Sequence, residues 1–127
     1  MTDPRDISVK AHAYYLTEHS QPEQGRYSFG YTITITNQGK ENVQLLDRHW
    51  LITDGIGRRQ EVKGVGVVGQ QPIIEPGDSY EYSSFCPLTT AYGYMEGSYG
   101  MVDDKGNQFR AEIPMFVLGE PTARSLN

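Results

Sequence analysis

Residues 26–36 alternate between large apolar side chains and small, mainly polar ones, and this pattern constrains the fold more than any other part of the sequence. The apolar members are Tyr27, Phe29, Tyr31, Ile33 and Ile35. A period of two is that of a β-strand, because successive side chains point to opposite faces of a sheet. One apolar face and one hydroxyl-bearing face are typical of an antiparallel sheet that covers a core. We therefore predict a strand whose five apolar side chains face away from solvent.

Six further segments have the composition of strands, at about residues 7–16, 43–53, 59–65, 79–85, 94–102 and 108–116. Within 43–53 the apolar parity switches near residues 47–49, which predicts a bulge or bend. Short turns separate the segments, and residues 103–107 join the last two as a hairpin. Seven strands at such intervals predict an all-β fold, an immunoglobulin/fibronectin type III-like antiparallel β-sandwich of seven or eight strands. Helices are expected only as short turns.

The length of 127 residues and the absence of a linker indicate one domain, residues 1–127. We expect its core to span about residues 7–118 and its polar ends, residues 1–6 and 119–127, to be disordered. The single cysteine, Cys86, cannot form an internal disulfide, and the polar N-terminal residues do not resemble a signal peptide. The expected location is therefore a reducing cytoplasm.

Charge and hydropathy disfavour two classes of partner. The net charge is −5, from 16 acidic and 11 basic residues that are scattered along the chain. Nucleic acid binding requires a gathered basic surface, because phosphates repel an acidic one. No window approaches the roughly 18 to 20 continuous apolar residues of a membrane span. We expect neither nucleic acid binding nor a membrane span.

Four stretches, in the right order along the chain, resemble the ApaG family: PEQGRY at residues 22–27, QLLDRHW at 44–50, GVGVVGQQP at 64–72 and GSYGMVD at 97–103. The resemblance covers about residues 7–118. It implies a fibronectin-like sandwich, in agreement with the strand pattern, and a bacterial protein linked to cobalt resistance and magnesium efflux. Similar domains in eukaryotic F-box proteins imply protein binding, and no catalytic residues come with the family. A chain without a membrane span would regulate efflux rather than form the pore.

Residues 64–69 fit the pattern GxGxxG, whose glycines let backbone N–H groups approach a pyrophosphate at the start of a following helix. Here the prolines at 72 and 76 prevent such a helix, so the dinucleotide interpretation loses its main physical support. A glycine-rich nest would still hold a phosphate weakly. The candidate anion-binding residues are Lys63, Gly64, Gly66 and Gly69. The favoured alternative is a bulged loop or strand edge without a tight nucleotide site.

The three histidines do not have the spacing of a metal site. His12 and His19 lie close to each other in sequence and His49 lies far from both, and no two of them form a short i, i+2 or i, i+4 pair. Asp47 and His49 share one strand face and are the one local pair of ligands. We favour surface or hydrogen-bonded histidines and predict that the protein holds no structural metal.

Other candidate groups are also incomplete. Asp103 and Asp104 lie in a short turn that cannot supply the six to eight oxygens that Ca²⁺ takes. Cys86 would act as a nucleophile only beside a histidine, and a buried structural cysteine is the expected alternative. No serine lies in a G-x-S-x-G elbow. The sequence therefore predicts no catalytic residues and no cofactor.

Arg48, His49 and Trp50 bring a cation, an imidazole and the single tryptophan into one strand. Alternation places Arg48 and Trp50 on one face and His49 on the other. With Trp50 as a core anchor, Arg48 would cover it or pair at the rim. The exposed aromatic surface that binds a partner would instead be formed by a second group, Tyr92, Tyr94 and Tyr99.

Without a catalytic set, the predicted function is a non-catalytic binding or regulatory module for protein–protein interaction with an unidentified protein partner. The alternative is a weak phosphate- or nucleotide-binding protein, or an enzyme, that uses the loop of residues 64–69. An exposed apolar surface without a deep polar pocket would favour the first. Convergent polar groups with perturbed pKa values would favour the second.

Overall fold

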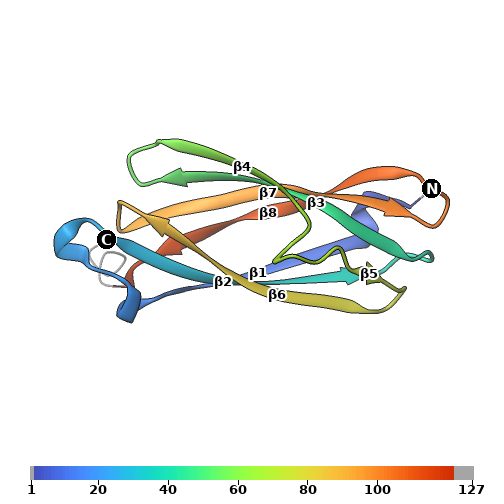
Figure 1. The fold of residues 1–127 in the computed structure, drawn as a ribbon, viewed down its shortest axis with the longest axis horizontal. Helices are drawn as coiled ribbons and strands as arrows, with labels where there is room; N and C mark the ends of the chain where they lie inside the picture. Colours follow the sequence, from blue (N-terminus) through green and yellow to red (C-terminus); the bar gives the residue numbers. More distant parts are fainter. Residues whose placement is uncertain (1, 122–127) are drawn as a thin grey trace.

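The computed structural model describes residues 2–121 and consists almost entirely of antiparallel strands in two layers (Figure 1). All seven predicted strands are present, and an eighth, β5, was missed because it is only two residues long. The strands are β1 (Ile7–Tyr15), β2 (Tyr27–Asn37), β3 (Val43–Asp54), β4 (Arg59–Val65), β5 (Ile73–Ile74), β6 (Ser79–Leu88), β7 (Tyr92–Asp103) and β8 (Gln108–Gly119). Helical turns are short, as predicted: η1 (Pro4–Asp6), η2 (Thr17–His19) and η3 (Pro22–Gln24) are 3-10 turns.

The strands form a three-stranded sheet in the order β1-β2-β6 and a five-stranded sheet in the order β4-β3-β7-β8, with β5 paired to β3. The two sheets lie face to face, and β1 packs beside β8 along one side of the molecule (Figure 1). The predicted class of fold, an antiparallel β-sandwich of the immunoglobulin or fibronectin type, is confirmed. Within residues 2–121, no helix is long or apolar enough to cross a membrane.

The register predicted for β2 is confirmed. Phe29, Ile33 and Ile35 are completely buried, Tyr31 is buried, and Tyr27 is half-buried. The opposite face of β2 is polar, and Thr32 Oγ1 lies 2.8 Å from the hydroxyl oxygen of Ser83 on the neighbouring strand. The alternation of the sequence and the burial of the sheet therefore agree, because one face packs on the core and the other meets solvent.

The predicted bulge in β3 is also present. Its pairing with β7 shifts register between Leu45 and Asp47, slightly before the parity switch in the sequence. A second shift, between Met95 and Gly97 in the pairing of β7 with β8, was not predicted. Irregularities of this kind increase the local twist of a sheet and redirect side chains.

The polar N-terminus is more ordered than expected. The Asp3 side chain accepts a hydrogen bond from the backbone N–H of Arg5 and caps η1. Thr2 is buried, and its backbone N–H donates to Asp103 Oδ2 over 3.1 Å. The expectation of disorder in residues 1–6 is therefore wrong for residues 2–6, because a buried carboxylate on β7 binds this segment. The second expected disordered segment, residues 119–127, is ordered at its start, because Gly119 ends β8 and the Glu120 N–H donates to the Ala91 carbonyl, and residues 122–127 lie outside the described part of the chain.

Candidate functional site

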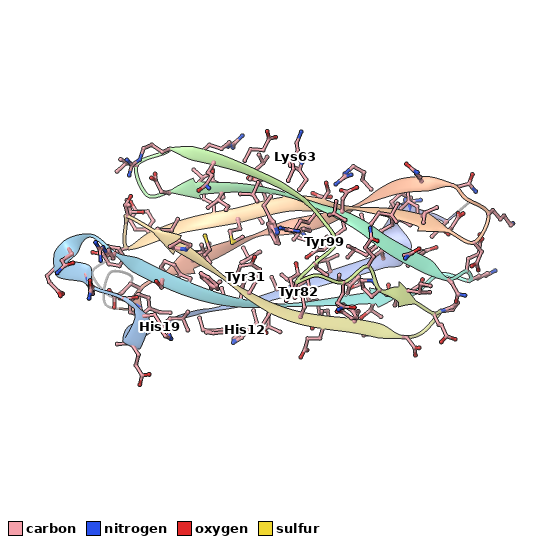
Figure 2. All side chains as sticks on the ribbon, viewed as in Figure 1. His12, His19, Tyr31, Lys63, Tyr82 and Tyr99 are labelled. Atoms are coloured by element: carbon pink, nitrogen blue, oxygen red, sulfur yellow. The ribbon has the colours of Figure 1, made fainter. Side chains whose placement is uncertain are left out.

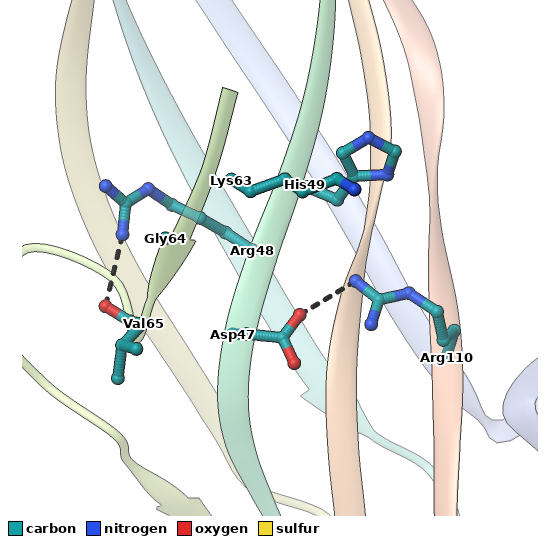
Figure 3. Close-up of a pocket in the computed structure, with 7 residues that line it drawn as sticks. All are labelled: Asp47, Arg48, His49, Lys63, Gly64, Val65 and Arg110. Atoms are coloured by element: carbon teal, nitrogen blue, oxygen red, sulfur yellow. Dashed lines mark hydrogen bonds and ion pairs between the residues drawn. The ribbon is translucent and has the colours of Figure 1, made fainter. Parts of the chain in front are cut away.

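A depression of about 580 Å³ opens on the outer face of the five-stranded sheet (Figure 3). Strands β3, β4 and β8 supply its walls. It is lined by Asp47, Arg48, His49, Lys63, Gly64, Val65 and Arg110. Two of the four predicted anion-binding residues, Lys63 and Gly64, are therefore in this depression, and sequence reasoning missed the arginine from β8.

The register of the sheet brings these residues together. In the β3–β4 pair, Arg48 lies opposite Gly64 and His49 lies opposite Lys63. Strand β7 separates β3 from β8, and its Gly100 lies between Asp47 and Arg110. A Cβ atom at Gly100 would collide with the Asp47 carboxylate and with the Arg110 guanidinium. Glycine at this position thus lets two charged side chains meet above the sheet.

Most of the charged groups in and around the depression are already paired. Arg110 Nη2 donates to Asp47 Oδ1 over 2.9 Å, and its Nε donates to the Ser98 hydroxyl oxygen. His49 Nε2 lies 2.7 Å from Glu61 Oε2. That hydrogen bond, helped by the positive charge of Lys63, lowers the pKa of the Glu61 carboxyl. Such pairs on an exposed face stabilise weakly, so they orient side chains more than they hold the fold.

Arg48 and Lys63 are the two remaining cations. Neither forms a direct ion pair with a carboxylate within residues 2–121. Arg48 Nη1 instead donates to the carbonyl oxygens of Val65 and Gly66, over 3.1 and 2.9 Å (Figure 3). Its guanidinium lies against Gly64, where a Cβ atom would collide with it. Trp50 is the expected core anchor, with 2% of its surface exposed, and Arg48 binds backbone carbonyls beside β4 instead of pairing with a carboxylate.

The glycine-rich segment forms a tight turn beyond the depression. The Val67 N–H donates to the Gln70 carbonyl, the Gln70 N–H donates back, and the Gly66 N–H donates to the Leu46 carbonyl. Gly66 and Gly69 have φ values of 65° and 77°, which suit glycine. Three N–H groups that a phosphate would need are therefore bound to carbonyls of the protein, and no helix follows. Gly66 and Gly69 do not line the depression with Lys63 and Gly64.

Val68, at the tip of this turn, has a φ of +47°, the only positive φ of a non-glycine residue within residues 2–121. A β-branched residue rarely adopts the left-handed region, because its side chain crowds the backbone there. Val65, Val68 and Ile73 expose 74%, 62% and 64% of their surfaces. Sequence reasoning treated this segment as a glycine loop. The signal that could have identified an exposed apolar segment was the set of apolar residues that lie between glycines, glutamines and a proline.

The three histidines lie apart. His12 is on the outer face of the three-stranded sheet, with its ring centroid 5.8 Å from that of Tyr14, and His19 is in η2. Figure 2 shows both on the opposite side of the molecule from Lys63. Asp47 and His49 share a face as predicted, but each has a different partner. No group of three or more His, Cys, Asp or Glu side chains in residues 2–121 is arranged to hold a metal ion.

Asp103 closes the β7–β8 hairpin. Its Oδ1 accepts hydrogen bonds from the backbone N–H groups of Lys105 and Asn107, both over 3.0 Å. Burial raises the pKa of this carboxyl, but the hydrogen bonds from Asn107, Thr2 and Lys105 outweigh burial and bring the pKa to about 2. The carboxylate is therefore a structural cap of the turn.

The interior between the sheets contains the remaining candidate groups. Cys86 is buried, as expected, and burial raises the pKa of its thiol to about 11, so the thiol is neutral near pH 7. Tyr82 and Tyr99 join the two sheets through a hydrogen bond between their hydroxyls (Figure 2). Tyr99 is completely buried, so the predicted aromatic surface is wrong for this residue. Tyr92 is exposed and Tyr94 is half-buried.

Comparisons with known proteins agree with this architecture. The family model for the ApaG domain matches residues 17–103. A protein named Protein ApaG from Brucella canis is 52% identical over 120 residues, which cover 94% of this chain and 92% of the relative. A protein of the same name from Afipia carboxidovorans is 51% identical over the same coverage. The crystal structure of a Bordetella pertussis protein described as ApaA has a TM-score of 0.89 at 47% identity, covering 91% of this chain and 94% of that one.

Proposed function

We propose, from the premise that this chain belongs to the ApaG domain family, that it is a non-catalytic module that binds another protein. The proposed contact surface consists of residues 65–73, which we term the valine segment, and the depression beside it. In this proposal the protein acts in the cytoplasm. Any contribution to cobalt resistance or magnesium efflux, which rests on the family resemblance alone, would pass through the bound protein.

The observation that carries the proposal is the conformation of Val68. A non-glycine residue in the left-handed region costs on the order of 1–3 kcal/mol. The Val68 side chain is 62% exposed, so it contributes little packing to offset that cost. Glycine or asparagine would adopt the same backbone with less strain. A strained and exposed apolar side chain is typical of a site where a partner covers it.

The surroundings of Val68 suit a protein partner. Val65 and Ile73, at the two ends of the valine segment, are also mainly exposed and would be apolar anchors. Arg48 and Lys63 lie next to the segment without direct ion pairs in residues 2–121. Apolar anchors beside cations are matched by a partner surface with apolar pockets and acidic side chains.

Support for a non-catalytic role comes from the state of the reactive groups. The Cys86 thiol is buried and neutral, and the nearest surface imidazole in the depression, His49, is bound to Glu61. A nucleophile requires an adjacent base in hydrogen-bond reach, and in residues 2–121 the Cys86 thiol contacts only the Pro87 carbonyl oxygen, whereas His49 and Glu61 pair with each other and have no nucleophile beside them. The depression presents paired charges instead of a nucleophile and a base.

The test is capture of proteins from the native cytoplasm with the purified chain, with and without cobalt, magnesium and nucleotides. A captured protein is then purified, and its Kd is measured for wild type and for Val65→Ser combined with Val68→Asn. We expect at least a tenfold weaker Kd, which corresponds to about 1.4 kcal/mol. Ile56→Ser is the matched control, because Ile56 is equally exposed but lies in the β3–β4 turn. Equal weakening by both changes would contradict the proposal.

A second candidate function is weak phosphate binding, and it is favoured by one observation. The side chains of Arg48, Lys63 and Arg110 line the same depression, with Lys63 and Arg110 on one side of β3 and the Arg48 guanidinium on the other (Figure 3). Side chains rather than the glycine-rich turn would hold the anion, because the N–H groups of Gly66, Val67 and Gln70 are already bonded and Gly66 and Gly69 do not line the depression. We expect a Kd for ATP or diadenosine tetraphosphate on the order of millimolar, about −4 kcal/mol. Titration calorimetry checks this value, and micromolar binding lost in Lys63→Ala would make the nucleotide function the leading one.

A further inference from the structure

We infer that the free edge of β6 receives an extended segment of a partner protein as an additional antiparallel strand of the three-stranded sheet. This inference deepens the proposed protein-binding function, since it gives the partner a second contact of defined chemistry. It concerns a surface on the opposite sheet from the depression. Three features carry it: the unpaired backbone, the absence of edge protection and the side-chain rows that end at β6.

The backbone groups of alternate β6 residues have no partner. Within residues 2–121, β2 is the only neighbour of β6. At the start of this pair the Asn37 N–H donates to the Asp78 carbonyl over 3.0 Å, so even-numbered residues of this strand face β2. The N–H and C=O groups of the odd-numbered residues therefore point away from the sheet. Pro87 has the same parity, as expected for a residue without an N–H at an edge.

The odd-numbered residues are all solvent-exposed: Ser79, Glu81, Ser83, Phe85 and Pro87. None of their N–H groups donates to a loop or turn in the described part of the chain. Four residues, 79 to 85 in steps of two, thus offer both a donor and an acceptor to an incoming strand. Backbone pairing of this kind is how an extended peptide adds to a sheet edge.

The other long edges are protected. Strand β4 carries Arg59, Glu61 and Lys63 among its seven residues, and charged side chains discourage pairing of an edge. Strands β1 and β8 pack beside each other, so each obstructs the other's edge. Strand β6 has ten residues and one charge, Glu81. It is therefore the long edge that is best suited to receive another strand.

The side chains on the outer face form rows that end at this edge. One row runs from Tyr14 across Gly30 to Phe85, and the Tyr14 ring covers the glycine where a Cβ atom would otherwise be. Phe85 exposes 68% of its surface. Because cross-strand neighbours are the main stabilising contacts on a sheet face, the next member of this row should be apolar.

Two further rows specify the rest of the partner. One row consists of Lys10, Thr34 and Glu81, and it ends at β6 with a carboxylate. His12, Thr32 and Ser83 form the row between. An antiparallel partner strand should therefore carry three side chains at alternate positions, counted from its N-terminus. They are an apolar residue opposite Phe85, Ser or Thr opposite Ser83, and Lys or Arg opposite Glu81.

A second copy of this chain fits the edge less well. Two β6 strands paired about Ser83 would place the Glu81 carboxylate opposite the Phe85 ring of the other copy. That arrangement would leave the carboxylate without a cation and the ring without an apolar neighbour. A heterologous segment with the pattern above satisfies both positions, and we commit to it.

The test uses the full chain and a short synthetic peptide that carries Val, Thr and Lys at three alternating positions. Amide NMR shifts and hydrogen exchange are recorded during titration. We expect the amides of Glu81, Ser83 and Phe85 to shift and become protected, while Tyr82 and Ser84, which face β2, keep their exchange rates. Ser83→Pro removes the central outward N–H and should abolish binding. Phe85→Lys, which adds charge at an exposed position, should also abolish it and tests the same edge without a proline.

A charge exchange tests the specificity. Glu81→Lys should weaken binding of the lysine peptide about tenfold, since an attraction becomes a repulsion. A peptide with Glu in place of Lys should then bind the Glu81→Lys protein. Glu112→Lys is the matched control on the five-stranded sheet and should leave the Kd unchanged.

Several outcomes would overturn the inference. They are the absence of peptide binding, shifts confined to the valine segment, equal effects of Glu81→Lys and Glu112→Lys, or pairing of two copies through β6 in the free protein. None of them affects the proposed function, because that proposal is tested by Val65→Ser combined with Val68→Asn on a captured protein. If no protein were captured while the peptide still bound, the proposed function would be contradicted and the inference about β6 would stand.

Discussion

The turns at residues 103–107 and 66–70 both follow strands of the five-stranded sheet, yet they are built differently. In the first, glycine occupies the left-handed position, with Gly106 at φ 81°, and the Asp103 carboxylate accepts three backbone N–H groups. In the second, the left-handed position at 68 is occupied by valine, at φ 47°. The first follows the ordinary chemistry of turns and the second departs from it.

The difference indicates what each turn contributes. The 103–107 turn satisfies its polar groups internally and binds the N-terminal segment, which are contributions to stability. The 66–70 turn stays closed because Val67 is completely buried and Gly66 fits against Gln70, so the fold holds Val68 in place despite the strain. A departure from turn chemistry that the surrounding structure enforces is where a function should be sought.

The largest effect is expected from Gly66→Val. A Cβ atom at this position would collide with the Gln70 carbonyl oxygen, and φ 65° is unfavourable for valine. The free energy of unfolding should fall by about 3 kcal/mol or more. Chemical denaturation measures it, and Gly69→Ala, at a position with open space around it, should cost clearly less. Gly66→Val is therefore unsuited to testing ligand binding, because it damages the fold.

Asp103→Ala should have the next largest effect, a decrease in Tm of several degrees. It leaves the N–H groups of Thr2, Lys105 and Asn107 without their acceptor. Asp104→Ala is the control in the same turn, since Asp104 is exposed and accepts a single backbone N–H, that of Asn42, where Asp103 accepts three. Thermal unfolding followed by circular dichroism compares the two. A Tm for Asp103→Ala equal to that of the control would contradict the structural role of Asp103.

The pH dependence of stability should reflect the same carboxylate. The pKa of Asp103 is lowered from 3.8 to about 2 in the folded protein, so the unfolded state binds the proton more readily. Its contribution is complete above about pH 4 and is lost as the pH falls towards 2. Denaturation at several pH values should show a smaller acid-induced loss in Asp103→Asn than in wild type between these limits. Identical curves would show that Asp103 is not the group responsible.

The smallest effect, with opposite sign, is expected from Val68→Asn. Asparagine tolerates the left-handed region better than valine, so the protein should become more stable by about 1 kcal/mol. Because Val68 is mainly exposed, little packing is lost. The denaturation midpoint measures the gain. Greater stability combined with weaker partner binding would show that Val68 serves binding, in contrast to the stabilising turn at residues 103–107. Lower stability would show that the valine serves the fold.

Much of the fold was predictable from local pattern, but the candidate site was not. The alternation in β2 and the hairpin at residues 103–107 depend on near neighbours in the chain, and both predictions agree with the structure. The depression joins Asp47 to Arg110, and no local pattern relates residues 63 positions apart. Lys63 and Gly64 were predicted for the wrong reason, since the glycine motif forms a closed turn. The site results from side chains on neighbouring strands.

The amino-acid sequence by itself determined the class of fold, seven of the eight strands, the buried face of β2 and the anchor position of Trp50. The reason is that a period of two and turn residues act over a few positions, where hydrophobic burial leaves one register. The tertiary structure alone decided that Gly100 makes room for an ion pair, that Tyr99 meets Tyr82 inside, and that Val68 is held in a strained conformation. It also left β6 at the end of its sheet, with one row of backbone groups unpaired and few charged side chains to protect it. These features depend on which strands become neighbours, and that order is set by the packing of the two sheets as a whole.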